Sequence, residues 1–282
     1  MIQFIKKILS KVIIFFSRVS GINNIIKSLA LININQIYSL EKFSSKKNLL
    51  RFGFKIFSQQ DEDGIIEEIF KRIKIKNKNF LEIGVETGVE SNTTYLLIQG
   101  WNGLWIEGKK SFFKDIVNNF SKYLVNKNLK VSINKVYPEN INNILEKYYK
   151  PNEEIDLLSI DIGCHTYHVL KELDFINPRV VVTEYNAKYG PSIMWEVNYI
   201  KNMNWDYSDY FGASLNSFVN VMKKKGYSLV ACNVTGVNAF FIRNDLISDN
   251  FDTNFGSQDH FLEGRYWLKS AFSSNYKINI NS

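Results

Sequence analysis

The middle of the chain is built from short apolar runs that alternate with longer amphipathic segments. Five apolar runs predict strands, at 80–83, 104–106, 129–133, 155–161 and 179–183. The segments between them, at 91–98, 111–123, 140–149 and up to about 174, have helical spacing. Strands alternating with helices in this way predict a doubly wound α/β fold with a mostly parallel sheet.

Two more apolar runs, at 227–232 and 238–243, follow a helix predicted up to Lys225 and its terminating Gly226. They are joined by only five residues, so they predict a closing strand hairpin. The sheet is therefore expected to have seven strands, with an antiparallel last strand. The long aromatic segment 190–207 is expected to be a lid or a binding loop.

Ahead of the first strand, Ser58 and three acids, Asp61, Glu62 and Asp63, precede an amphipathic stretch. A polar residue followed by acids in the first turn is typical of a helix start. We interpret the acids as helix caps. Gln59 and Gln60 fit either that role or contact with the edge of a ligand.

The first 31 residues have apolar positions at helical spacing, with lysines between them. The longest apolar run, 12–16, is too short to cross a bilayer, and no signal-peptide cleavage site stands out. This cationic amphipathic extension fits peripheral membrane contact through residues 1–30, or packing against the domain or a second subunit. We divide the chain into this extension with its connector (1–57), a catalytic domain (58–245) and an aromatic tail (246–282) packing on the domain.

Charge is distributed unevenly along the 282 residues. The chain has a net charge of +7, and residues 1–50 hold eight lysines or arginines against a single acid, Glu41. The remainder carries balanced charge, so we expect no nucleic-acid-binding surface on the body. The two cysteines, Cys164 and Cys232, fit no metal spacing and favour a reducing, cytoplasmic location.

The candidate chemistry begins where the first strand ends, in the order Glu82-x-Gly84-x-Glu86-x-Gly88. Glycines allow a sharp turn and a close backbone approach at this position. Glu107 ends the second strand 23 residues after Gly84, where a carboxylate can accept both hydroxyls of a ribose. These features predict an adenosine-type ligand.

The residues between the glycines indicate which ligand this is. A dinucleotide site requires Gly-x-Gly-x-x-Gly around a pyrophosphate. Here Glu82 and Glu86 are acidic, and carboxylates suit a positively charged sulfonium better than a phosphate. Asn92 is expected at the start of the following helix, and Asn134, at the end of the third strand, is expected near an adenine ring.

The fourth and fifth strands end on acids, Asp161 and Glu184, with Asn186 and His165 close by in sequence. Because the carboxyl ends of parallel strands share one edge, these side chains form a candidate catalytic group. The carboxylates could orient a substrate hydroxyl or hold a divalent cation, and His165 could take the hydroxyl proton. The alternative is that both acids only accept backbone N–H groups at strand ends. We predict no resident metal.

Several stretches together resemble class I S-adenosylmethionine-dependent methyltransferases, in a bacterial branch related to the FkbM type and associated with surface-polysaccharide genes. They are Ser-Gln-x-Asp-Glu-Asp-Gly, Phe-Leu-Glu-Ile-Gly-Val, Glu-Ser-Asn-Thr, Gly-Leu-Trp-Ile-Glu-Gly, Leu-Leu-Ser-Ile-Asp-Ile, Glu-Tyr-Asn-Ala, Asp-Tyr-Phe-Gly-Ala-Ser-Leu and Asn-Ala-Phe-Phe-Ile-Arg. The resemblance covers residues 59–243. It implies that Glu82, Gly84 and Gly88 contact the methionine end of S-adenosylmethionine, that Glu107 binds ribose, and that Asp161 is the fourth-strand acid.

One stretch departs from that branch. Where relatives read Asp-Ile-Asp-Gly-Asn-Asp-Tyr, this chain has Asp-Ile-Gly-Cys-His-Thr-Tyr, so Gly163 and Thr166 replace acids. The expected function is O-methylation of a sugar or surface-glycan precursor. The rivals are an inactive protein that binds an adenosyl ligand and a nicotinamide-dependent oxidoreductase, although nicotinamide Rossmann domains lack the closing hairpin.

Overall fold

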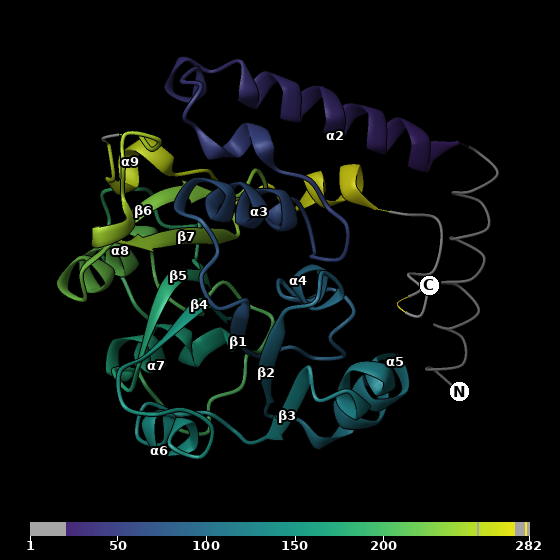
Figure 1. The fold of residues 1–282 in the computed structure, drawn as a ribbon. Helices are drawn as coiled ribbons and strands as arrows, with labels where there is room; N and C mark the ends of the chain where they lie inside the picture. Colours follow the sequence, from purple (N-terminus) through teal and green to yellow (C-terminus); the bar gives the residue numbers. More distant parts are fainter. Residues whose placement is uncertain (1–20, 253, 274–279, 281–282) are drawn as a thin grey trace.

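The computed structural model describes residues 21–252, 254–273 and 280. A single seven-stranded sheet in the order β3-β2-β1-β4-β5-β7-β6 runs through the molecule (Figure 1). Its strands are β1 (Asn79–Ile83), β2 (Asn102–Glu107), β3 (Leu129–Ile133), β4 (Glu153–Ile160), β5 (Ile176–Glu184), β6 (Tyr227–Cys232) and β7 (Asn238–Arg243).

The strand directions confirm the predicted fold. β1 to β5 pair in parallel, and β7 runs antiparallel to both β5 and β6. This is the class I methyltransferase-like arrangement that the closing hairpin predicted. β3, β6 and β7 have the predicted bounds, whereas β5 begins earlier, at Ile176. The sequence hid this extension because Pro178 lies inside the added segment, where a proline normally argues against a strand.

Helices cover both faces of the sheet (Figure 1). One face packs against α3 (Glu62–Ile73), α4 (Thr94–Ile98) and α5 (Phe113–Val125), and the other against α6 (Ile141–Leu145), α7 (Thr166–Glu172) and α8 (Leu215–Lys224). Leu81 and Ile83 face one apolar cluster while Phe80 faces the other, so the near-continuous apolar runs fill both faces. α4 and α6 are shorter than predicted because hydrogen-bonded turns replace part of each expected helix.

The extension contains one described helix, α2 (Ile22–Tyr38), which continues past the expected end at Leu31. The rest of the predicted amphipathic stretch, 1–20, lies outside the described residues. Two short 3-10 helices follow, η1 (Glu41–Phe43) and η2 (Leu49–Phe52). None of the described helices is long and apolar enough to cross a membrane.

The tail folds back on the domain through η5 (Asn244–Leu246), α9 (Ser257–His260) and η6 (Tyr266–Phe272). η6 packs along α2, so segments from the two ends of the chain lie side by side (Figure 1). Their buried residues form a third apolar cluster with the β6–β7 connection: Ala30, Ile34, Ile37, Leu268, Ala271 and Val234 among others.

The acids before α3 have a different role from the capping that their positions suggested. The structure contradicts that interpretation, because Asp61 is the N-cap and its side chain makes no capping bond. Asp61 instead accepts from the amide of Val234, and Glu62 accepts from the side chains of Asn233 and Asn238. Asp63 accepts the amides of residues 56–58. The three acids therefore tie α3 to the β6–β7 connection and to the preceding loop.

Candidate functional site

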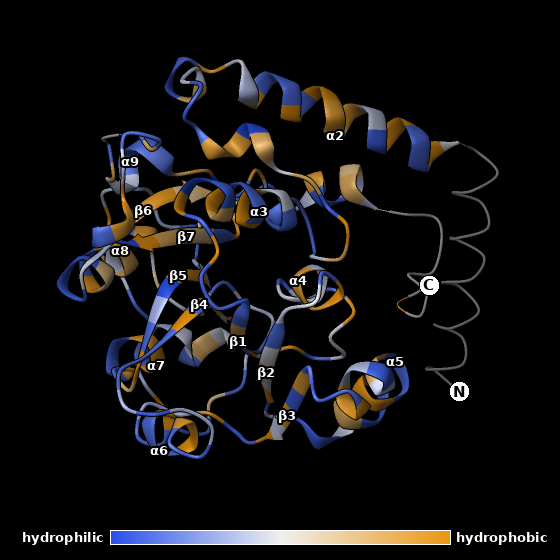
Figure 2. Cartoon of the chain, in the orientation of Figure 1, coloured by the Kyte–Doolittle hydropathy of each residue, from blue (hydrophilic) through white to orange (hydrophobic). Residues whose placement is uncertain are grey.

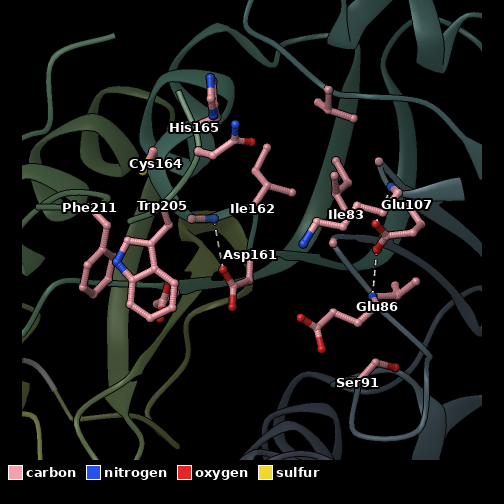
Figure 3. Close-up of a pocket in the computed structure, with 18 of the residues that line it drawn as sticks. Ile83, Glu86, Ser91, Glu107, Asp161, Ile162, Cys164, His165, Trp205 and Phe211 are labelled. Atoms are coloured by element: carbon pink, nitrogen blue, oxygen red, sulfur yellow. Dashed lines mark hydrogen bonds between the residues drawn. The ribbon is translucent and has the colours of Figure 1, made fainter. Parts of the chain in front are cut away.

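A cavity of about 1510 Å³ opens at the carboxyl ends of the parallel strands. Its wall includes the β1–α4 turn, the tips of β2 to β5, the loop 201–211 and tail residues 263–266. In Figure 3, Asp161 lies between Glu86 and Glu107 on one side and Trp205 and Phe211 on the other. We call these sides the β1–β2 half and the β4–β5 half.

Close packing within the protein explains the two glycines of the β1–α4 turn. Gly84 has φ +88°, and a Cβ there would lie 1.8 Å from the carbonyl oxygen of Asp161. Gly88 has φ +77°, and a Cβ there would lie 2.5 Å from the Trp105 ring. Gly84 lines the cavity, whereas Gly88 is not among the lining residues. Both glycines shape the turn, and the predicted ligand contact is open only to Gly84.

Glu86 has a backbone conformation that glycine adopts more readily than other residues. Its φ is +51°, in the left-handed region that L side chains rarely adopt. Its N–H donates to the Glu107 carboxylate at 2.8 Å, a bond that fixes this conformation (Figure 3). The motif therefore keeps its turn without the middle glycine, and gains a carboxylate on the cavity wall.

Glu82 is buried, and both of its carboxylate oxygens are engaged by the start of the α4 segment. Oε1 accepts from the amide of Asn92 at 3.0 Å, and Oε2 accepts from the amide of Thr93 at 3.1 Å. Burial raises the pKa of Glu82, and these hydrogen bonds oppose that shift. Glu82 therefore holds the end of β1 to the start of the α4 segment, and it also borders the cavity.

Glu107 lies on the same wall and faces the turn. Besides the Glu86 amide, its carboxylate accepts the amide of Lys109 at 2.7 Å. Each carboxylate oxygen has two acceptor positions, so one on each oxygen is left for a ligand hydroxyl. These two backbone bonds hold the carboxylate in a fixed orientation towards the cavity.

The two asparagines predicted to contact the cofactor border the same half. Asn92 donates from its side chain to Ser159 at 3.1 Å, and Asn134 donates to Ser132 at 2.7 Å. The backbone of Asn134 also pairs with the carbonyl of Glu107, which places it at the end of β3. Both line the cavity.

Asp161 and Glu184 both border the β4–β5 half of the cavity and are close enough to affect each other's pKa. The Asp161 side chain is exposed to the cavity, but protein surrounds the floor on which both groups lie. Desolvation there raises the pKa of both carboxyls, and repulsion from Asp161 raises that of Glu184 further. Raised pKa values in two neighbouring acids favour a state in which the pair holds one proton. Asp161 also accepts the amide of Gly163 at 3.3 Å.

The geometry does not support the base role predicted for His165. Its Nε2 lies 3.2 Å from the carbonyl oxygen of Ile200 and 3.1 Å from that of Lys201. A ring nitrogen between two carbonyls acts as a donor, and the ring points away from Asp161 (Figure 3). His168 similarly contacts the carbonyl of Val197 at 2.7 Å. The two histidines fasten the loop 197–201.

Asn186 also holds a loop. Its side-chain amide donates to the carbonyls of Asp209 and Phe211, both at 2.9 Å, and its oxygen accepts the amide of Lys188. Both N–H donors are therefore used within the protein. Asn186 borders the cavity, and its free acceptor position on the amide oxygen is the part of the side chain left for an acceptor molecule.

The cavity is lined by aromatic residues that we did not predict as site residues from the sequence. Trp205 and Phe211 come from the loop, with ring centroids 5.8 Å apart, and Tyr266 comes from the tail. The aromatic content of 190–207 was a usable signal for Trp205. No signal pointed to Tyr266, because the tail reaches this edge through contacts with segments distant in sequence, such as the bond from the Arg265 amide to the carbonyl of Thr235.

The structure has open space at Gly163, one of the two positions where the related branch has an acid. A Cβ at Gly163, which has φ +61°, would meet no atom within 4 Å. Thr166 accepts the amide of Ile162 through its hydroxyl at 2.9 Å. Among the described residues, no group of three or more histidines, cysteines or acids is placed to hold a metal ion.

No protein-family model and no curated protein matches the sequence. Solved structures with a similar fold include the N-terminal domain of EvdMO1 with SAH bound, at 12% identity and TM-score 0.42, over 67% of this chain and 88% of that one. A S-adenosylmethionine-dependent methyltransferase from Clostridium acetobutylicum gives 12% and 0.38, over 64% and 90%. The glycopeptide N-methyltransferase MtfA with SAM gives 11% and 0.39, over 63% and 92%. What these proteins share with this chain is the fold.

Proposed function

We propose that this protein is a S-adenosylmethionine-dependent methyltransferase that methylates a hydroxyl of a sugar or surface-glycan precursor. The observation that carries the proposal is the Glu107 carboxylate, fixed against the Glu86 amide on the wall of a cavity that ends at the Asp161–Glu184 pair. This arrangement joins a ribose-binding acid to a proton-accepting floor.

The charge of the wall fits the cofactor. Nine carboxylate side chains border the cavity against four lysines, and Glu86 and Asp161 lie near its centre (Figure 3). Such a wall attracts a positively charged sulfur. The free acceptor positions on Glu107 fit ribose hydroxyls, and the volume exceeds that of a typical single-ligand pocket, which leaves room for an acceptor.

The same turn argues against a nicotinamide dinucleotide. A pyrophosphate needs free backbone N–H groups at the turn and the helix start. Here the Gly84 and Gly88 amides bond to carbonyls, and the Glu86 amide bonds to Glu107. Glu82 takes the amides of Asn92 and Thr93, and its position would repel a phosphate. Five backbone donors of the turn and the helix start are therefore already used within the protein.

Bound S-adenosylmethionine would supply a methyl group carried on positively charged sulfur. Glu107 would hold the ribose, and the carboxylate of Glu86 would lie near the positive charge. The Asp161–Glu184 pair would accept the hydrogen bond of the acceptor hydroxyl and orient its oxygen towards the methyl carbon. The pair would take the hydroxyl proton as the O–C bond forms and the bond between the methyl carbon and sulfur breaks, with the sulfur leaving as a neutral thioether. Because the pKa of Glu184 is raised more, Glu184 would hold the proton of the pair, and Asp161 would be the ionised carboxylate that accepts the proton of the hydroxyl.

The aromatic residues favour a sugar. Trp205 and Phe211 lie beside Asp161 on the cavity wall (Figure 3), and Tyr266 also lines the cavity. A pyranose ring has an apolar C–H face and hydroxyl edges, which match aromatic rings and carboxylates respectively.

The proposal is tested by incubating the protein with methyl-labelled S-adenosylmethionine and a panel of sugars, nucleotide sugars and glycan fragments. We expect label in a hydroxyl of at least one sugar, and loss of that label in Asp161→Asn. Label only in amines would overturn the hydroxyl assignment.

A second function, an inactive protein that binds an adenosyl ligand, is favoured by Gly163 and Thr166, which replace acids of the related branch. Binding of S-adenosylhomocysteine without transfer to any member of the panel would select that function. The intact Asp161–Glu184 pair supports the enzyme instead.

A further inference from the structure

The exposed side of α2 carries an apolar stripe that nothing in the described protein covers. Ile22, Ile25, Ile26, Leu29 and Ile32 are each between 45% and 59% exposed. At 100° per residue these positions fall within an arc of about 120° on the helix surface. We call them the isoleucine face. The hydropathy colouring shows orange bands along this helix at the edge of the molecule (Figure 2).

A different side of the same helix already binds the protein. Ala30, Ile34 and Ile37 are buried in the cluster shared with η6. The isoleucine face is therefore not needed to attach α2 to the domain. Isoleucine and leucine exposed in a continuous row are the mark of a surface that binds something else.

The neighbouring charges are positive. Neither α2 nor η6 contains an acidic residue, and each carries an exposed lysine, Lys27 and Lys269. The sequence before α2 adds Lys6, Lys7, Lys11 and Arg18. Two copies of the chain paired through this face would bring the lysines of α2 and η6 together, whereas an anionic surface would neutralise them.

An aromatic anchor accompanies the stripe. Trp267, on η6, is 59% exposed although its neighbour Leu268 is fully buried. Tryptophan beside lysines and an apolar helix face is the combination that settles at a membrane–water interface.

From these observations we propose that α2 and η6 form a docking surface for an anionic lipid bilayer. The isoleucine face and Trp267 enter the interface, and the lysines contact acidic headgroups. The segment 263–266 lines the cavity and leads directly into η6. Docking would thus hold the cavity mouth close to the bilayer.

The test is co-sedimentation of the full chain with phosphatidylcholine vesicles, with and without phosphatidylglycerol. We expect binding only to the anionic vesicles, weakened by salt. The double variant Ile25→Asp/Leu29→Asp should bind about tenfold or more weakly, because it removes apolar burial and adds negative charge. Val125→Asp, which changes an exposed apolar residue on α5, should bind as the wild type.

Lys27→Glu/Lys269→Glu should lower both the binding and its dependence on salt. All variants should keep the wild-type circular dichroism spectrum, since each altered side chain is exposed. Equal binding to neutral vesicles, or unchanged binding by Ile25→Asp/Leu29→Asp, would overturn the proposal. So would a wild-type dimer in light scattering that this variant converts to monomer, because the face would then join two copies.

Discussion

The two halves of the cavity are built differently. In the β1–β2 half, the turn amides, Glu82 and Glu107 bond to one another and leave little freedom. In the β4–β5 half, Asp161 and Glu184 are open to the cavity, and a loop and the tail form the wall. The first half is set by local hydrogen bonds close to one turn, and the second by contacts between distant segments.

This difference suggests a division of labour. A rigid, internally bonded half suits binding of an invariant cofactor, because its groups are held in place before the ligand arrives. An open half with two carboxyls of raised pKa suits proton transfer and a variable acceptor. Variants in the two halves should therefore separate turnover from cofactor binding.

The largest effect is expected at the open half. Asp161→Asn should lower kcat by roughly 10² to 10⁴-fold, since the hydroxyl loses its proton acceptor. Binding of S-adenosylhomocysteine should change by less than about threefold, because Glu107 and the β1–α4 turn stay intact. Glu263→Gln, a change at a cavity-lining acid paired with Arg265, is the matched control and should leave kcat near the wild-type value. Equal losses of kcat and cofactor affinity in Asp161→Asn would contradict the separation of turnover and cofactor binding between the two halves.

Next to the β6–β7 connection, the acids before α3 should make stability depend on pH. Burial and the neighbouring Glu62 raise the pKa of Asp61 to about 8. The unfolded carboxyl ionises near pH 4, so the folded state binds the extra proton between about pH 4 and pH 8. Stability should fall by roughly 2 to 4 kcal/mol as pH rises through that window.

Asp61→Asn should flatten this decline, because asparagine keeps the neutral form at every pH. Urea unfolding at several pH values measures it, with Asp115→Asn, a change at an exposed acid on α5, as the control. A slope of the same size in Asp61→Asn would assign the dependence to another group.

In the rigid half, Glu107→Gln should weaken S-adenosylhomocysteine binding by about 10- to 30-fold. The amide can accept at only one oxygen, so one of its two backbone bonds and one ribose contact are lost. Glu90→Gln provides a matched control, because Glu90 borders the same cavity but pairs with Lys55 at the surface. Calorimetric titration of both variants with S-adenosylhomocysteine gives the comparison. Equal affinities of the two variants would contradict ribose binding by Glu107.

The smallest effect concerns the loop. His165→Phe and His168→Phe should each cost about 1 kcal/mol and speed amide hydrogen exchange across 197–211. The ring contacts of His165 with Tyr137 and Tyr199 should persist, since phenylalanine keeps an aromatic ring. His260→Phe removes a similar bond, to Asn254, and should affect only the tail. Unchanged exchange in the loop would return His165 to consideration as a base.

The rigid half and the sheet could be predicted from the sequence because they depend on local patterns. The apolar runs gave all seven strands, and the spacing of Glu82, Gly84 and Glu107 gave their meeting at one edge. From the sequence alone, the glycines are explained by close approach to a ligand. In the structure, Asp161 and Trp105 of the protein itself leave no room for a side chain at Gly84 and Gly88.

The open half could not be predicted in the same way. His165 and Asn186 are polar residues beside the strand tips, a position that fits either catalysis or loop anchoring. Only the partners at Ile200, Lys201 and Phe211 decide between these roles, and those partners are distant in sequence. Tyr266 reaches the cavity because the tail bonds to Tyr185 and to Thr235 and packs on α2, all of them distant in sequence.

The central claim is that the cavity binds a nucleoside bearing positive sulfur and not a dinucleotide phosphate. Calorimetric titration of the wild-type protein with S-adenosylmethionine, and with NAD in parallel, tests it most directly. We predict saturable one-to-one binding of S-adenosylmethionine and no heat of binding for NAD. Tight NAD binding with no binding of S-adenosylmethionine would contradict this account.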